Sequence, residues 1–150
     1  MTQRLNYYSS GSDGLKSMLA LEQYLKTCGL EPGLIDLVKM RASQINGCAY
    51  CLDMHSREAR KQGESEQRLY VLPAWRETTL YTARERAALE WTEALTLIAE
   101  THAPDQSFES VRAQFNDKEL ADLTLAIGAI NVWNRIAIGF RAALPHAKAA

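Results

Sequence analysis

The stretch Asp36–His55 reads DLVKMRASQINGCAYCLDMH, and it decides the fold prediction. It contains two of the three cysteines, Cys48 and Cys51, and one of the three histidines, His55. In this C-x-x-C-x-x-x-H pattern, a helix beginning at Cys48 would place Cys51 and His55 on one face, four residues apart. The apolar residues before the motif also follow helical spacing, which indicates that the thiol pair follows a helix rather than a strand.

The sequence on both sides of this stretch predicts an all-α protein with about six or seven helices in a single domain, residues 1–150. Pro32 suits the first turn of a helix, Asn46-Gly47 breaks it, and Thr82 with Glu85 forms a capping box. No segment shows the sustained alternation of a strand. The expected helices cover about residues 13–28, 32–45, 48–62, 66–71, 83–98, 108–115 and 117–143. Gly128 and Gly139 in the last helix predict close approach of another helix.

Composition excludes several classes of partner. The net charge is −1 and the charged residues are interspersed, so no basic stripe predicts nucleic-acid binding. No apolar run approaches the roughly 18–20 residues of a membrane span, and the N-terminus lacks a signal pattern. A cytoplasmic location is therefore expected, where structural disulfides are rare and a C-x-x-C pair more often cycles or binds metal.

Three chemistries are open to the Cys48–Cys51 pair in such a protein. Haem attachment needs a histidine directly after the second cysteine, and Leu52 stands there. Zinc needs four ligands in a structural site, whereas the motif supplies Cys48, Cys51 and His55. A fourth ligand could come from Asp36 or Cys28, so a zinc site stays open as an alternative.

Thiol–disulfide exchange fits the pair best. Two cysteines three apart in a helical turn have Cα atoms about 5 Å apart, within disulfide reach. The Asn46-Gly47 break places them at a helix N-terminus, where free N–H groups and the helix dipole stabilise a thiolate. His55 could accept the thiol proton or act as its cationic partner. A thioredoxin fold is excluded, because it requires a strand before the motif.

Four segments together resemble the alkylhydroperoxidase D-like, carboxymuconolactone decarboxylase superfamily. They read ASQINGCAYCLDMH, RLY…LPAW, TARERAALEWTEALT and AINVWNRIAIGFR, and the resemblance covers roughly residues 15–142. It implies the all-α alkylhydroperoxidase D-like helical fold, assembled as a homo-oligomer, a trimer or a hexamer.

The resemblance also implies roles for four residues. Cys51 would attack the peroxide, Cys48 would resolve, and His55 would be the base. The relay carboxylate, a glutamate in the redox branch of the family, falls on Asp36, one methylene shorter, twelve residues before Cys48. In thioredoxin-type motifs the first cysteine is normally the exposed one, so the attacker is not fixed by the motif; the i, i+4 relation to His55 favours Cys51.

The function predicted from these residues is a thiol-dependent peroxidase that uses no metal and no organic cofactor and depends on an external dithiol. The alternatives are a lactone decarboxylase, which needs acid–base groups and no dithiol, and a non-catalytic zinc or redox-sensing module. Further positions could support the thiol site or simply pack: Tyr50, Asp53, Asn131, Trp133, Asn134 and Arg135.

Overall fold

The computed structural model describes residues 2–144, and within this range the chain is helical, with no strand. The predicted all-α class is confirmed, and the helix count is close to the prediction. The elements are η1 (Tyr7–Ser10), α1 (Asp13–Leu25), α2 (Pro32–Asn46), α3 (Ala49–Lys61), α4 (Glu66–Val71), η2 (Leu72–Glu77), α5 (Ala83–Thr96), α6 (Ile98–Thr101), α7 (Asp105–Arg112) and α8 (Asp117–Phe140). Pro145 and His146, expected to end the chain without a role, lie outside the described residues.

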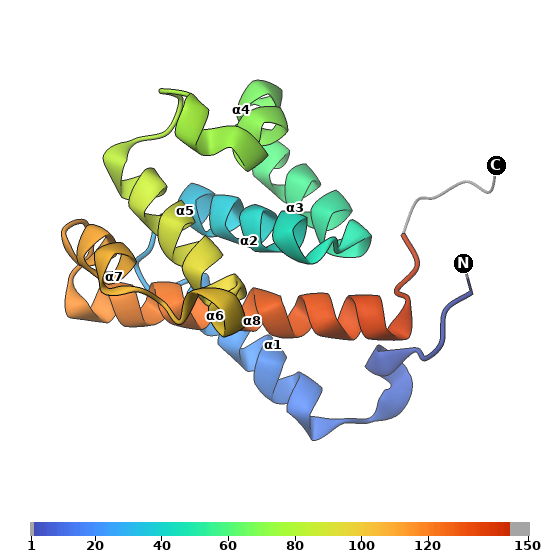
Figure 1. The fold of residues 1–150 in the computed structure, drawn as a ribbon. Coiled ribbons are helices and arrows are strands. Elements are labelled where there is room, and N and C mark those ends of the chain that lie inside the picture. Colours follow the sequence, from blue (N-terminus) through green and yellow to red (C-terminus); the bar gives the residue numbers. More distant parts are fainter. Residues whose placement is uncertain (1, 145–150) are drawn as a thin grey trace.

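Helix α2 is the centre of the molecule, with α3, α5 and α8 packed around it (Figure 1). Every residue from Leu34 to Met40 is buried, because the apolar positions of α2 are too many for one stripe and face several neighbours. This position in the core also buries Asp36 and Lys39, which are rarely buried residue types.

The turn between α2 and α3 follows the sequence prediction. Gly47 ends α2 with a φ of 69°, a left-handed conformation that glycine adopts without steric cost. The Cys48 N–H then donates to the Ser43 carbonyl at 3.0 Å, and α3 begins one residue later. The C-x-x-C pair is thereby fixed at the N-terminus of α3 by the end of the central helix.

Several boundaries differ from the prediction. Helix α1 ends at Leu25, four residues before Gly29, and Leu97 separates α5 from the short helix α6. The close helix approach expected at Gly128 and Gly139 is wrong: both glycines are exposed, and a Cβ built at either would meet nothing within 4 Å. Both glycines instead lie on the solvent-facing side of α8.

By length and composition alone, helix α8 could cross a membrane. The expectation that no apolar run approaches the length of a membrane span therefore does not hold for α8. Its apolar residues Leu123, Ile127 and Ile130 are nevertheless fully buried against the other helices. Across the whole apolar window of the helix, 39% is buried.

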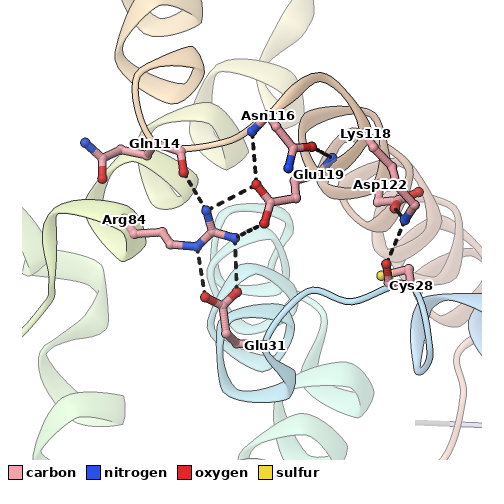
Figure 2. A network of polar contacts seen from close by, with 8 residues as sticks. All are labelled: Cys28, Glu31, Arg84, Gln114, Asn116, Lys118, Glu119 and Asp122. Carbon is pink, nitrogen blue, oxygen red and sulfur yellow. Dashed lines mark hydrogen bonds and ion pairs between the residues drawn. The ribbon is translucent and has the colours of Figure 1, made fainter.

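An ion-pair network joins the beginnings of α2, α5 and α8 (Figure 2). Arg84 donates to Glu31 and Glu119, each at 2.9 Å, and its guanidinium lies 3.9 Å from the centre of the Phe115 ring. Nearby, Lys118 donates to the main-chain oxygen of Cys28 at 2.7 Å. The network fixes one end of the helix assembly and ties Cys28 to that end.

Candidate functional site

Cys48 and Cys51 form a disulfide at the N-terminus of α3. Cys48 is the N-cap residue, and its sulfur accepts a hydrogen bond from the Cys51 N–H at 3.3 Å. The Cα atoms lie 5.4 Å apart, inside the range for a disulfide. The predicted proximity of the two cysteines is therefore present, with Cys48 immediately before the first turn of the helix rather than within it.

The two cysteines differ in their surroundings, although both are buried. Both lie in an apolar cluster with Ala42, Ile130 and Ala137. Cys51 also lines a pocket of about 280 Å³, which His55 lines as well. The pocket gives Cys51 the more direct route to a small molecule, while Cys48 is held in the packed cluster beside it.

The pocket, here called the Cys51 pocket, is lined by apolar, aromatic and charged side chains. Side chains from five elements and the turn after α1 contribute to it. Its lining residues are Tyr7, Tyr8, Leu19, Glu22, Lys26, Lys39, Tyr50, Cys51, Met54, His55, Glu58, Trp133 and Ala137. This lining suits a small organic molecule that presents a reactive group to Cys51.

His55 is buried and bound by a carboxylate that the sequence analysis missed. Its Nδ1 lies 3.2 Å from Oε2 of Glu58, one turn further along α3. This hydrogen bond is the main cause that lowers the pKa of Glu58. The H-x-x-E spacing is the signal that could have identified Glu58, since residues three apart share a helix face.

Asp36 lies near His55 and Glu58, and the three residues offer ligand atoms that all lie within 4.8 Å of one another. Within residues 2–144, Oδ2 of Asp36 is buried and has no hydrogen-bond partner. Burial raises the pKa of Asp36 from 3.8 to about 6, with Glu58 adding to the rise and His55 opposing it. The structure thus brings the predicted carboxylate to the predicted histidine.

Lys39 offsets only part of the effect of burial on the pKa of Asp36, because its ammonium is held by Glu22. Its ammonium lies 2.5 Å from Glu22, and the same carboxylate accepts a hydrogen bond from the Trp133 indole at 3.0 Å. These contacts tie α1, α2 and α8 together on one side of the Cys51 pocket. Among the α8 candidates Asn131, Trp133, Asn134 and Arg135, Trp133 lines the pocket.

The remaining candidates have packing contacts. Asn134 donates to Ser43 at 3.0 Å, and Asn46 donates to both Asn131 and Asn134, which joins α8 to α2 behind the cysteines. Arg135 donates to Asn131 on the same helix, and Asp53 pairs with Arg57 at 2.9 Å. Tyr50 is half-buried and lines the Cys51 pocket.

Neither of the two ligand sets that the sequence left open for zinc is assembled among residues 2–144. The sulfurs of Cys48 and Cys51 are joined to each other, and Cys28 packs in other clusters and donates its thiol to the Leu25 carbonyl. The groups that are brought together are Asp36, His55 and Glu58. The arrangement as a whole is a disulfide-linked cysteine pair and a buried histidine with two nearby carboxylates.

The protein is thus an all-α protein with a redox-capable cysteine pair and a histidine at one pocket. Comparison with known proteins identifies its family. Residues 13–94 match the family model for the carboxymuconolactone decarboxylase family, and the chain belongs to that family. This confirms the resemblance to the alkylhydroperoxidase D-like superfamily found in the sequence.

Individual relatives agree with this family assignment. The chain is 46% identical to the uncharacterized protein YdfG of Bacillus subtilis, over 95% of this chain and 99% of the relative. It is 51% identical, with a TM-score of 0.93, to a crystal structure from Agrobacterium tumefaciens of a protein of unknown function linked by name to the antioxidant defence protein AhpD; the match covers 97% of this chain and 100% of the other. An uncharacterized peroxidase-related protein from Silicibacter is 25% identical with a TM-score of 0.73, over 86% of this chain and 69% of the other.

Proposed function

We propose that this protein is a thiol-dependent peroxidase that reduces organic hydroperoxides. The observation that carries the proposal is that Cys51 and His55 line one pocket while Cys48 lies within disulfide distance of Cys51. The aromatic and apolar wall of that pocket suits the organic part of an alkyl hydroperoxide. The disulfide corresponds to the oxidised end of the proposed cycle.

The proposed cycle has three steps. The Cys51 thiolate attacks the terminal oxygen of the hydroperoxide; the O–O bond breaks, one proton is taken up, and a sulfenic acid and an alcohol form. The Cys48 thiol then attacks the Cys51 sulfur, which forms the disulfide and releases water. An external dithiol reduces this disulfide by thiol–disulfide exchange and becomes oxidised itself.

His55 is the base in this proposal, and Glu58 is its positioning residue. A hydrogen bond from Nδ1–H of His55 to Glu58 leaves Nε2 free to take a proton from the thiol of Cys51. Asp36 is the relay carboxylate proposed from the resemblance. Its raised pKa, about 6, supports this role because the group can both bind and release a proton near neutral pH.

The partners proposed for this cycle are a peroxide and a dithiol-containing reductant in the cytoplasm, with no nucleic acid or membrane involved. We also propose a homo-oligomer, a trimer or a hexamer. Exposed apolar residues on α8, Leu125 and Val132, together with Leu19 on α1, support it because another copy of the chain could cover them.

The test is the loss of an organic hydroperoxide in the presence of a dithiol. Cys51→Ser should fall to the uncatalysed rate, and His55→Ala should lose about 100-fold, the usual contribution of a general base. Cys48→Ser should accumulate the Cys51 sulfenic acid and stop after one turnover. Cys28→Ser is the matched control and should retain the wild-type rate, because Cys28 packs in other clusters.

Unchanged turnover in Cys51→Ser would refute the mechanism. Mass spectrometry after mild peroxide treatment gives a second check, since the reduced protein should lose two hydrogens across Cys48 and Cys51. A lactone decarboxylase is the second candidate, and the pairing of His55 with two nearby carboxylates favours it as an acid–base site. Decarboxylation that survives Cys48→Ser and Cys51→Ser together would establish that candidate instead.

A further inference from the structure

The three side chains Asp36, His55 and Glu58, which have proton-transfer and positioning roles in the proposed cycle, also form a group that could hold a metal ion. We call it the carboxylate–histidine cluster. It joins α2 to α3, and its imidazole nitrogen and carboxylate oxygens lie within 4.8 Å of one another. Asp36 and His55 are buried, whereas the Glu58 side chain is 49% exposed and opens the cluster to solvent.

One oxygen of the cluster is left without a partner. Asp36 is only 7% exposed, and its Oδ2 meets no hydrogen-bond donor within residues 2–144. A buried carboxylate oxygen normally has a donor or a cation beside it. The adjacent ammonium, Lys39, is engaged by Glu22 at 2.5 Å, and its attraction offsets only part of the effect of burial, which still raises the pKa of Asp36.

We propose that the carboxylate–histidine cluster binds a divalent transition-metal ion of the Zn²⁺ class, with Asp36, His55 and Glu58 as its three protein ligands. Imidazole with carboxylate oxygens is a ligand set that suits Zn²⁺, and three protein ligands leave a fourth position for water. The two carboxylates and the neutral imidazole carry a charge of −2, which balances the ion.

The distances are compatible with this site after a small rotation. Ligand atoms about 2.0–2.2 Å from a tetrahedral zinc lie about 3.4 Å from one another. The 3.2 Å separation of His55 Nδ1 and Glu58 Oε2 already matches that spacing. Glu58 is free to adjust because its side chain is half exposed, and bringing the ion to Asp36 gives the unpartnered oxygen its cation.

Metal binding and thiol chemistry would compete for the same histidine. If Nδ1 of His55 binds Zn²⁺, the neutral imidazole carries its proton on Nε2, so Nε2 cannot take the thiol proton and an occupied site would inhibit peroxide reduction. This consequence rests on the proposed function, whereas the binding itself does not.

The experiment measures Zn²⁺ binding directly, in full-length protein with the Cys48–Cys51 disulfide closed and Cys28→Ser in the background. This protein has no thiolate, so calorimetric titration with Zn²⁺ reports on nitrogen and oxygen ligands alone. We expect one Zn²⁺ per chain. Asp36→Asn and Glu58→Gln should each weaken binding by at least about tenfold, since even the loss of a partner beyond the direct ligands has an effect of about 10–100-fold.

Asp53→Asn is the matched control, because Asp53 lies on the same helix but pairs with Arg57, and its affinity should equal that of the background protein. Glu58→Gln is the decisive variant, since a half-exposed side chain can change without loss of folding. A loss below tenfold in either ligand variant, or no binding below about 1 mM Zn²⁺, would overturn the proposal.

The same titration separates this proposal from the proposed function. Zn²⁺ binding in a protein that consumes no peroxide would leave the metal site standing and refute the peroxidase. Peroxide reduction in a protein that binds no Zn²⁺ would support the peroxidase and refute the metal site.

Discussion

Glu93 on α5 and Asp36 on α2 are both largely enclosed carboxylates, and their surroundings are opposite. Glu93 accepts hydrogen bonds from Arg41 at 2.7 Å and from the Trp75 indole at 2.8 Å, and it also pairs with Arg76. Burial alone would raise the pKa of Glu93, but these donors outweigh it and lower the pKa. At Asp36 burial prevails, and the pKa rises to about 6.

The difference separates a carboxylate that stabilises the fold from one that the fold holds at a cost. Glu93 on α5 binds Arg41 on α2 and both Trp75 and Arg76 on η2, so it connects the three elements. These cationic and N–H donors neutralise its charge. Asp36 sits in the most buried helix with one oxygen unpartnered and a second carboxylate, Glu58, nearby. Perturbed groups of this kind concentrate at functional sites, which is the role proposed for Asp36.

The largest effect on stability is expected from Glu93→Ala. It leaves Arg41, a largely buried cation, without its carboxylate and the Trp75 N–H without an acceptor. Removing one partner of a buried pair typically lowers the free energy of unfolding by about 3–5 kcal/mol. Urea denaturation would measure it, with Glu109→Ala, an exposed glutamate on α7, as a control that should change little. A loss below about 1 kcal/mol would show that Glu93 is not structural.

Asp36→Asn should act in the opposite direction on stability. A rise in pKa from 3.8 to about 6 disfavours the ionised carboxylate in the folded protein by on the order of 3 kcal/mol at neutral pH. Asparagine removes the charge but keeps a polar group without a partner, so we expect a net gain of about 1 kcal/mol. The same urea series measures it, in the presence of a chelator.

Peroxide reduction by Asp36→Asn should fall even though the protein becomes more stable. A variant that gains stability and loses activity would support Asp36 as a functional group that the fold holds at a cost. A variant that loses both would instead place Asp36 among the structural carboxylates with Glu93, and the comparison would fail.

The helix pattern was largely predictable, because it depends on local chemistry. The capping box at Thr82–Glu85 and the break at Gly47 lie where the sequence indicated. The ends of α1 and α5 were not predicted, since no strong breaker marks Leu25 or Leu97. The exposure of Gly128 and Gly139 depends on which face of α8 packs against the other helices. The low helix propensity of glycine does not indicate which face that is.

The site was only partly predictable for the same reason. Cys48, Cys51 and His55 lie in one short motif, so helical spacing alone brought them together, and the resemblance supplied Asp36. Glu58 was missed because it lies between Arg57 and Arg60 on α3, where charges usually face solvent. The sequence did not show that Lys39 would bind Glu22 rather than Asp36, because that contact joins α1 to α2.

The pH dependence of stability gives a smaller effect. Glu93 has a folded-state pKa below its ordinary value of 4.5, so its contribution is complete above pH 4.5 and is lost as the pH falls through the folded-state pKa. Wild-type protein should therefore lose stability in acid more steeply than Glu93→Ala does, and the difference between the two curves should narrow. The comparison is made by urea denaturation at a series of pH values between neutral and acid; parallel curves would contradict the lowered pKa.

The smallest effect is expected at the network of Figure 2, where the charges are paired but closer to solvent. Arg84→Lys keeps the charge but loses the fork that reaches Glu31 and Glu119 together, and lysine cannot stack on Phe115 as a planar guanidinium does. Because Arg84 is 25% and Glu31 56% exposed in their side chains, we expect a loss of only about 1 kcal/mol, reduced further by salt. Arg112→Lys, whose pair with Asp117 spans 3.9 Å at the surface, should change stability less. If Arg84→Lys lowered the free energy of unfolding as much as Glu93→Ala does, solvent exposure would not explain the difference between the two networks. The number of carboxylates that each arginine pairs with would then determine the stability effect.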